Sequence, residues 1–86
     1  MKNDSSPNIV IQVNDLNIGD NIRKYRLREG LKQTEVVSKL QLIGIDISTY
    51  SYNRIEKGTQ NPTVSLLLAL CRLLNCNMNE LFDYKD

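Results

Sequence analysis

The chain has 86 residues, 41% of them hydrophobic and 24% charged, and a formal net charge of +1 at pH 7. This length supports one domain with a modest core, and the ordinary composition argues against wholesale disorder. No apolar run approaches the roughly 20 residues that span a bilayer, and the first residues, MKNDSSPN, lack the apolar segment of a secretory signal. We therefore expect a cytoplasmic, single-domain protein without membrane contact.

An N-terminal arm is predicted over residues 1–17. Its first part, MKNDSSP, is polar, whereas NIVIQVND carries β-branched residues at Ile9, Val10, Ile11 and Val13 and is typical of a short strand. A single strand is not stable alone, so this one must pair with something. It either packs against the domain or pairs with its copy in a homodimer.

From Asn17 onward, the apolar residues recur with helical spacing. The segment NIGDNIRKYRLREG predicts a first helix that Gly30 ends, and KQTEVVSKLQLIG predicts a second helix that Gly44 ends or kinks. The apolar residues expected to face the core from these two helices are Ile18, Ile22, Tyr25, Val36, Val37, Leu40 and Ile43.

Three further helices are predicted after Gly44. DISTYSYNRIEKG predicts a third that starts at Ser48 and ends at Gly58, QNPTVSLLLALCRLLN a fourth capped by Thr63, and NMNELFDY a short fifth. Their apolar faces carry Tyr52, Ile55, Leu67, Leu70, Cys71, Leu74, Met78, Leu81 and Phe82. Five short helices predict a compact all-α domain over residues 18–84, followed by a tail at 85–86.

Positive charge is concentrated in the middle of the chain. Residues 19–57 contain eight Lys or Arg and five Asp or Glu, a net charge of +3, while the segments before and after are each −1. The predicted third helix, rich in hydroxyl and amide side chains, lies in this segment. This local concentration of positive charge is therefore better evidence for a polyanionic partner than the net charge of the whole chain.

Few residues in the chain could support catalysis or bind a metal. Cys71 and Cys76, in a chain without histidine, are too few ligands for a tetrahedral zinc site. We interpret them as small apolar core residues in the reduced form. There is no phosphate-binding glycine loop, and the carboxylates are scattered over predicted helix surfaces. We expect no metal, no cofactor and no enzymatic activity.

Several motifs occur together in a characteristic order: GLKQTEV opens the second helix, NRIEKG closes the third, NPT opens the fourth, and LLN and NELF end the chain. With these motifs, the stretch from Ile18 to about Phe82 resembles the phage-repressor/Cro-type helix-turn-helix family, also called the xenobiotic-response-element type. The resemblance implies a five-helix repressor-like fold, in which the third helix enters the major groove of double-stranded DNA.

The resemblance also implies roles for individual residues of the third helix. The expected base-contacting residues are Thr49, Tyr50, Ser51, Asn53 and Arg54. Arg54 can form two hydrogen bonds with a guanine, and Asn53 can form two with an adenine. A solvated polar helix face would have a similar composition, and only the flanking motifs favour a role in binding.

Other residues are expected to contact phosphate or to hold the fold. Gln33 opens the second helix, where the family uses a glutamine on the DNA backbone, and Lys57, Thr59 and Asn61 lie in and before the loop that follows the third helix. Arg26 and Glu56 are expected to form an internal salt bridge. That salt bridge would orient the third helix without touching DNA.

The chain departs from the family between its second and third helices. Gln33 and Glu56 lie 23 positions apart, about five more than is usual for a helix-turn-helix with a short turn. The extra residues lie within QLIGID. Because Ile43 and Ile45 are apolar, we expect the insertion to be packed, as an extra turn of helix followed by a turn from Gly44.

The resemblance implies a sequence-specific DNA-binding transcriptional regulator, which we expect to be a repressor that binds a palindromic operator as a homodimer. The expected dimer residues lie on the arm and the fifth helix: Ile9, Ile11, Val13, Met78, Leu81 and Phe82. The alternative is an antitoxin-type protein, which neutralises a toxin partner and represses its own synthesis through DNA binding.

Overall fold

Five α-helices form the part of the chain that the structure describes, residues 17–83 of a computed structural model. In chain order they are α1 (Ile18–Arg28), α2 (Gln33–Leu42), α3 (Thr49–Lys57), α4 (Val64–Leu73) and α5 (Met78–Phe82). The all-α, five-helix prediction is therefore confirmed. The strand predicted for residues 9–13 lies outside the described residues.

Side-chain caps fix where three of the helices begin. Ser48 Oγ accepts from the Ser51 N–H at 3.0 Å, and Thr63 Oγ1 accepts from the Leu66 N–H at 3.1 Å. At the start of α5, Asn77 and Glu80 accept from each other's backbone N–H. Each cap satisfies a donor that the first turn of a helix leaves without an acceptor. Ser48 and Thr63 are the two caps predicted from the sequence.

Each of the first four helices ends at a residue with positive φ: Gly30, Gly44, Gly58 and Asn75. The end of α2 shows the geometry. The Ile45 N–H donates to Leu40 O at 2.9 Å, and the Gly44 N–H donates to Gln41 O at 3.1 Å. This is a Schellman motif, in which a left-handed residue lets two N–H groups bond back to the last turn of the helix.

The core is a cluster of aliphatic side chains around one tyrosine, and all five helices contribute to it. Its buried members are Ile18, Ile22, Val36, Val37, Leu40, Tyr52, Ile55, Leu66, Leu67, Ala69, Leu70, Leu74 and Leu81. Tyr25, Cys71, Met78 and Phe82 pack against this cluster and are only partly buried. Burying large aliphatic side chains of this kind contributes about 1.5–3 kcal/mol each.

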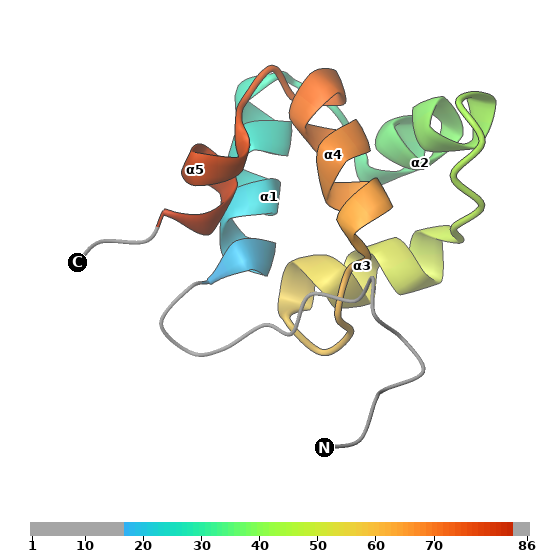
Figure 1. Cartoon of the computed structure of the whole chain (residues 1–86). Helices are drawn as coiled ribbons and strands as arrows, with labels where there is room; N and C mark the ends of the chain where they lie inside the picture. The colour runs from blue at the N-terminus through green and yellow to red at the C-terminus, as the bar shows by residue number, and fades with distance from the viewer. Residues whose placement is uncertain (1–16, 84–86) are drawn as a thin grey trace.

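The helices are arranged so that α3 lies along one side of the domain (Figure 1). α1 packs against α3 and α5, α2 packs against α3 and α4, and α4 packs against α5. A hydrogen bond from Asn21 Nδ2 to Leu81 O, 2.8 Å long, also ties α1 to α5. Within residues 17–83, no helix is long and apolar enough to cross a membrane.

The insertion between α2 and α3 is packed only in part. Ile45 and Ile47 lie against the core, and Gln41 Nε2 donates to Ile47 O at 3.1 Å across the connection. The prediction that Ile43 faces inward is wrong, because its side chain is 56% exposed, and Leu42 is 85% exposed. The physical reason is that α2 extends beyond Leu40, its last core residue, past the helices that it packs against.

Candidate nucleic-acid interface

α3 has one buried face and one open face. Tyr52, Ile55 and Glu56 are buried, whereas Tyr50 is 71% exposed and Lys57 is exposed. The remaining polar residues of the helix, Thr49, Ser51, Asn53 and Arg54, are half-exposed. The five residues expected to contact bases therefore all reach the surface. Tyr50 and Arg54 lie on the same side of the helix, because they are four residues apart.

Arg54 is held in place by its neighbours. Its guanidinium lies over the Tyr50 ring, 5.7 Å from the ring centroid. Arg54 Nη2 donates to Thr59 O at 3.2 Å, and Thr59 Oγ1 donates back to Arg54 O at 3.2 Å. A planar guanidinium presents several N–H donors in a fixed fork. These contacts orient that fork along the open face before any ligand arrives.

Asn53 lies on the side of α3 that faces α2. Gln33 Nε2 donates to Asn53 Oδ1 at 3.1 Å and to Glu56 Oε1 at 3.0 Å. The two side-chain N–H groups of Gln33 are therefore engaged within the domain. The bond also sets the orientation of the Asn53 amide, with its oxygen toward α2, so its NH₂ group is the part available to a ligand.

A buried ion pair anchors α3 to α1. Arg26 Nε lies 2.6 Å from Glu56 Oε2, and Arg26 Nη2 donates to Glu56 Oε1 at 3.0 Å. The third contact of this guanidinium is a bond from Nη1 to Leu31 O, 2.8 Å long. The structure thus brings together the two residues expected to form the internal salt bridge, and joins Gln33 to the same carboxylate.

The Glu56 carboxylate is stabilised as an anion despite its burial. Burial acts to raise its pKa, but the hydrogen bonds from Arg26 and Gln33, together with the nearby Tyr52 hydroxyl, outweigh burial, and the pKa lies below its ordinary value. The same bond to Glu56 raises the pKa of Arg26. Burial raises the pKa of the Tyr52 hydroxyl, whose oxygen makes no well-formed hydrogen bond within the described residues.

Gly19 sets how closely α1 approaches α3. A Cβ at this position would meet the carbonyl oxygens of Ile55 and Glu56 in the last turn of α3. Only a residue without a side chain allows this contact between two helix backbones. Sequence reasoning missed Gly19, although a glycine one residue into a predicted helix is a signal that close packing is required.

The residues expected to contact phosphate lie at the two ends of the helix pair. Gln33 opens α2, Lys57 ends α3, and Thr59 and Asn61 are exposed in the loop before α4. The loop is fixed where it leaves α3, because the Thr59 N–H donates to Arg54 O at 2.9 Å. The first turns of α2 and α3 also carry backbone N–H groups without helical acceptors, which favour anions.

The residues expected at a dimer interface are placed differently. Ile9, Ile11 and Val13 lie outside the described residues. Met78 and Phe82 are partly buried, with surface left for a partner, but Leu81 has no exposed surface. Leu81 is therefore not proposed as a dimer contact, because its side chain faces the interior of its own domain.

Cys71 and Cys76 meet at the end of α4. They occupy the two positions that touch in a Schellman motif, where the Cys76 N–H donates to Cys71 O at 3.0 Å. Both are free thiols and half-buried. Burial raises the pKa of both thiols, that of Cys76 to about 11, so both stay protonated at neutral pH. Residues 17–83 contain no cluster of three or more His, Cys, Asp or Glu placed to hold a metal ion.

Comparison with known proteins identifies the family. The helix-turn-helix family matches residues 22–81 of the chain. An uncharacterized HTH-type transcriptional regulator of Archaeoglobus fulgidus is 31% identical over 65 residues, which are 76% of this chain and 86% of that protein. No solved structure matches the chain significantly. The chain therefore belongs to the helix-turn-helix family, which confirms the resemblance drawn from its motifs.

Family membership and this relative both support a DNA-binding transcriptional regulator as the class of protein. Regulators of this class are typically not enzymes. In a helix-turn-helix domain, the second helix of the motif lies in the major groove while the first crosses the backbone. α2 and α3 are the corresponding helices here, with α3 as the second.

Proposed function

We propose that the protein is a sequence-specific repressor that binds a palindromic operator as a homodimer, with α3 in the major groove of each half-site. The observation that carries this proposal is the open face of α3. It combines hydrogen-bonding side chains with the oriented guanidinium of Arg54. The Arg26–Glu56 ion pair fixes this short helix on its buried side. Such a rigid polar helix is suited to reading base edges.

Within this proposal, Arg54 reads a guanine through its O6 and N7, and Tyr50 lies beside it against the neighbouring bases or backbone. Asn53 offers its NH₂ group first, because its oxygen already accepts from Gln33. We expect it to bind a base acceptor such as N7, with the second lone pair of its oxygen left for an adenine N6.

The phosphate contacts follow from the same geometry. Because the side-chain N–H groups of Gln33 are engaged by Asn53 and Glu56, its proposed phosphate contact is made through the backbone N–H at the start of α2. Lys57, Thr59 and Asn61 are the proposed contacts on the other side of α3. These contacts supply affinity and register, whereas the base contacts supply specificity.

The test is a pair of arginine substitutions assayed on the DNA upstream of the protein's own gene. Arg54→Ala is expected to weaken binding by roughly 1–3 kcal/mol and to relax specificity at one base pair. Arg23→Ala removes the same charge from the exposed surface of α1, outside α3, and is expected to have little effect. Fluorescence anisotropy over a salt series measures both, and the affinity of the parent should fall steeply with salt.

Binding that is insensitive to salt, or equal losses in the two variants, would contradict the proposal. Equal losses would mean that charge alone matters, and that α3 is not the helix that reads the sequence.

A further inference from the structure

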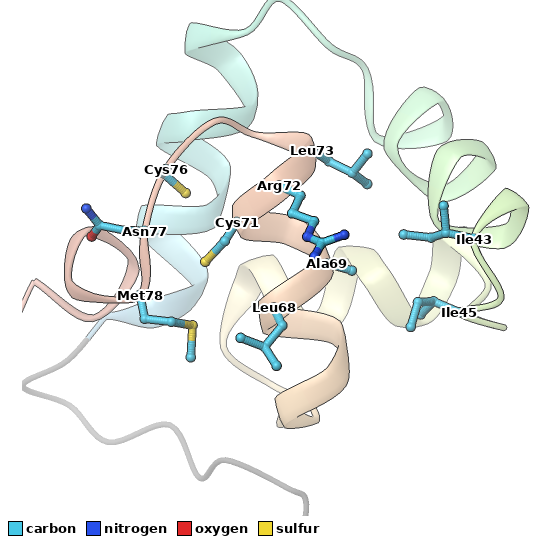
Figure 2. A pocket seen from close by; sticks show the side chains of 10 residues that line it. All are labelled: Ile43, Ile45, Leu68, Ala69, Cys71, Arg72, Leu73, Cys76, Asn77 and Met78. Carbon is cyan, nitrogen blue, oxygen red and sulfur yellow. The ribbon is translucent and has the colours of Figure 1, made fainter.

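A shallow apolar groove runs along the exposed side of α4. We call it the α4 groove and define it by Ile43, Ile45, Leu68, Ala69, Leu73 and Met78. Its volume is about 810 Å³, and its walls come from the α2–α3 connection on one side and from α5 on the other. Figure 2 shows Ile43 and Ile45 facing α4 across the groove, with Met78 on the opposite side of the helix.

The rim of the α4 groove exposes large apolar side chains that the core does not use. Leu68 is 53% exposed, and Ile43, just after the end of α2, is 56% exposed. Ala69, by contrast, is small and buried, which leaves a hollow in the floor. Contiguous exposed apolar surface on a small domain typically marks an interaction site. Ile43 and Ile45, which line the groove, belong to the insertion that distinguishes the chain from its family.

Two opposite charges accompany this apolar surface, one in its lining and one adjacent in sequence to a lining residue. Arg72 projects from α4 into the α4 groove, and Asp46 is exposed next to Ile45. Within residues 17–83 the ion pairs join Arg26 to Glu56 and Arg28 to Glu29, so neither Arg72 nor Asp46 has a charged partner in its own domain. A face that carries both an unpaired cation and an unpaired anion is complementary in charge to a copy of itself.

We propose that a second copy of this chain docks on the α4 groove. A twofold axis would place the exposed Ile43 of each copy in the hollow over Ala69 of the other, and would pair Arg72 with Asp46 of the opposite copy. Such an interface is isologous, because each copy contributes the same patch. No residue that lines the groove belongs to α3, so the open face of α3 stays free for DNA.

This inference rests on the proposed function, which requires two modules on two half-sites, and it names the surface that joins them. It also gives the insertion a role. The residues that lengthen the connection beyond the usual turn form one wall of the interface. Met78, expected from the sequence to lie at a dimer interface, lines the same groove.

The first test is the oligomeric state of the full chain by sedimentation equilibrium. The parent is expected to be a dimer, and Leu68→Glu to raise the dimer dissociation constant at least about tenfold, because a charge replaces a buried apolar contact. Leu27→Glu is the matched control. Leu27 is 50% exposed, almost the same as Leu68, but it lies on α1 outside the groove. It should leave the dimer intact.

A charge exchange tests the pairing directly and does not depend on the folding of Leu68→Glu. Arg72→Glu and Asp46→Arg are each expected to weaken the dimer, and the double variant to restore it, since each copy then carries the reversed pair. A parent that stays monomeric at high micromolar concentration would overturn the proposal. So would single variants that dimerise like the parent, or a double variant that is no better than either single one.

Alkylation of Cys71 and Cys76, which also line the groove, distinguishes the occupants. The rate should fall as protein concentration rises, because the second copy covers the thiols. A slow rate that does not change with concentration would mean that the chain's own N-terminal arm fills the groove, and would overturn the proposal. A dimer that behaves as expected but fails to bind DNA would support this interface and contradict only the proposed function.

Discussion

Glu56 joins three parts of the domain through one carboxylate. It receives hydrogen bonds from Arg26 on α1 and Gln33 on α2, while its own backbone belongs to α3. A buried ion pair does not necessarily stabilise a fold, because the loss of water offsets the attraction between the charges. Removing one partner, however, leaves the other charge buried and uncompensated. The pair therefore specifies one orientation of α3.

The pH dependence of stability should report this pair. Because the pKa of Glu56 is lower in the folded state than its ordinary value of 4.5, the contribution of its charge is fully present above that ordinary value and is lost as the pH falls through the lower folded-state pKa. Glu56→Gln should lower the free energy of unfolding by roughly 3–5 kcal/mol at pH 7. Urea denaturation from pH 3 to pH 7 measures the difference, which should shrink as the pH falls.

Glu29→Gln provides the comparison, because Glu29 is an exposed carboxylate with only a 3.4 Å contact to Arg28. It should change the free energy of unfolding by less than about 1 kcal/mol at any pH. A Glu56→Gln variant that is as stable as Glu29→Gln would show that the buried pair does not hold α3 in place.

Some placements of single residues could be predicted from the sequence. Tyr50 and Tyr52 are two positions apart, so they cannot share a helix face, and the structure places Tyr50 outside and Tyr52 inside. The bond from Gln33 to Asn53 could not be predicted. It depends on how two helices cross, which the spacing along one helix does not reveal.

At the scale of elements, α1 lies close to the backbone of α3 at Gly19. Gly→Ala in a helix interior usually gains about 0.5–1 kcal/mol, because alanine is the better helix former. At Gly19 the sign should reverse, since the new Cβ would meet backbone carbonyl oxygens of α3 that cannot move aside alone. We expect Gly19→Ala to destabilise the domain by roughly 1–3 kcal/mol.

Thermal unfolding followed by circular dichroism tests this expectation, with Ser38→Ala on the exposed face of α2 as the control. The control should be neutral or slightly stabilising. A Gly19→Ala variant that unfolds at the same temperature as the parent, or higher, would mean that α1 and α3 are not in backbone contact there.

The ends of the helices could be predicted well, and the reason is local. Gly30, Gly44, Gly58 and Asn75 are residues that adopt positive φ at low cost, and each one follows the last turn of a helix. The exposure of Leu42 and Ile43 could not be predicted. Helical periodicity shows which face of α2 is apolar, but it does not show where that face extends beyond the helices that pack against it.

The whole molecule presents two separate surfaces. The open face of α3 is polar and carries Arg54 and Lys57, while the α4 groove is apolar and belongs to other elements. A regulator that must contact DNA and a second copy at once needs two such surfaces. The sequence predicted the first through its motifs. It could not predict the second, because the groove is built from residues distant in the chain.

In the proposed function, α3 and the loop after it form the DNA-binding face. The most direct measurement is a titration of the ¹⁵N-labelled full chain with a duplex that carries its site, followed by amide chemical shifts. We expect the largest changes in residues 49–61 and at the start of α2, around Gln33. Largest changes in α4 and α5, with α3 unaffected, would contradict it.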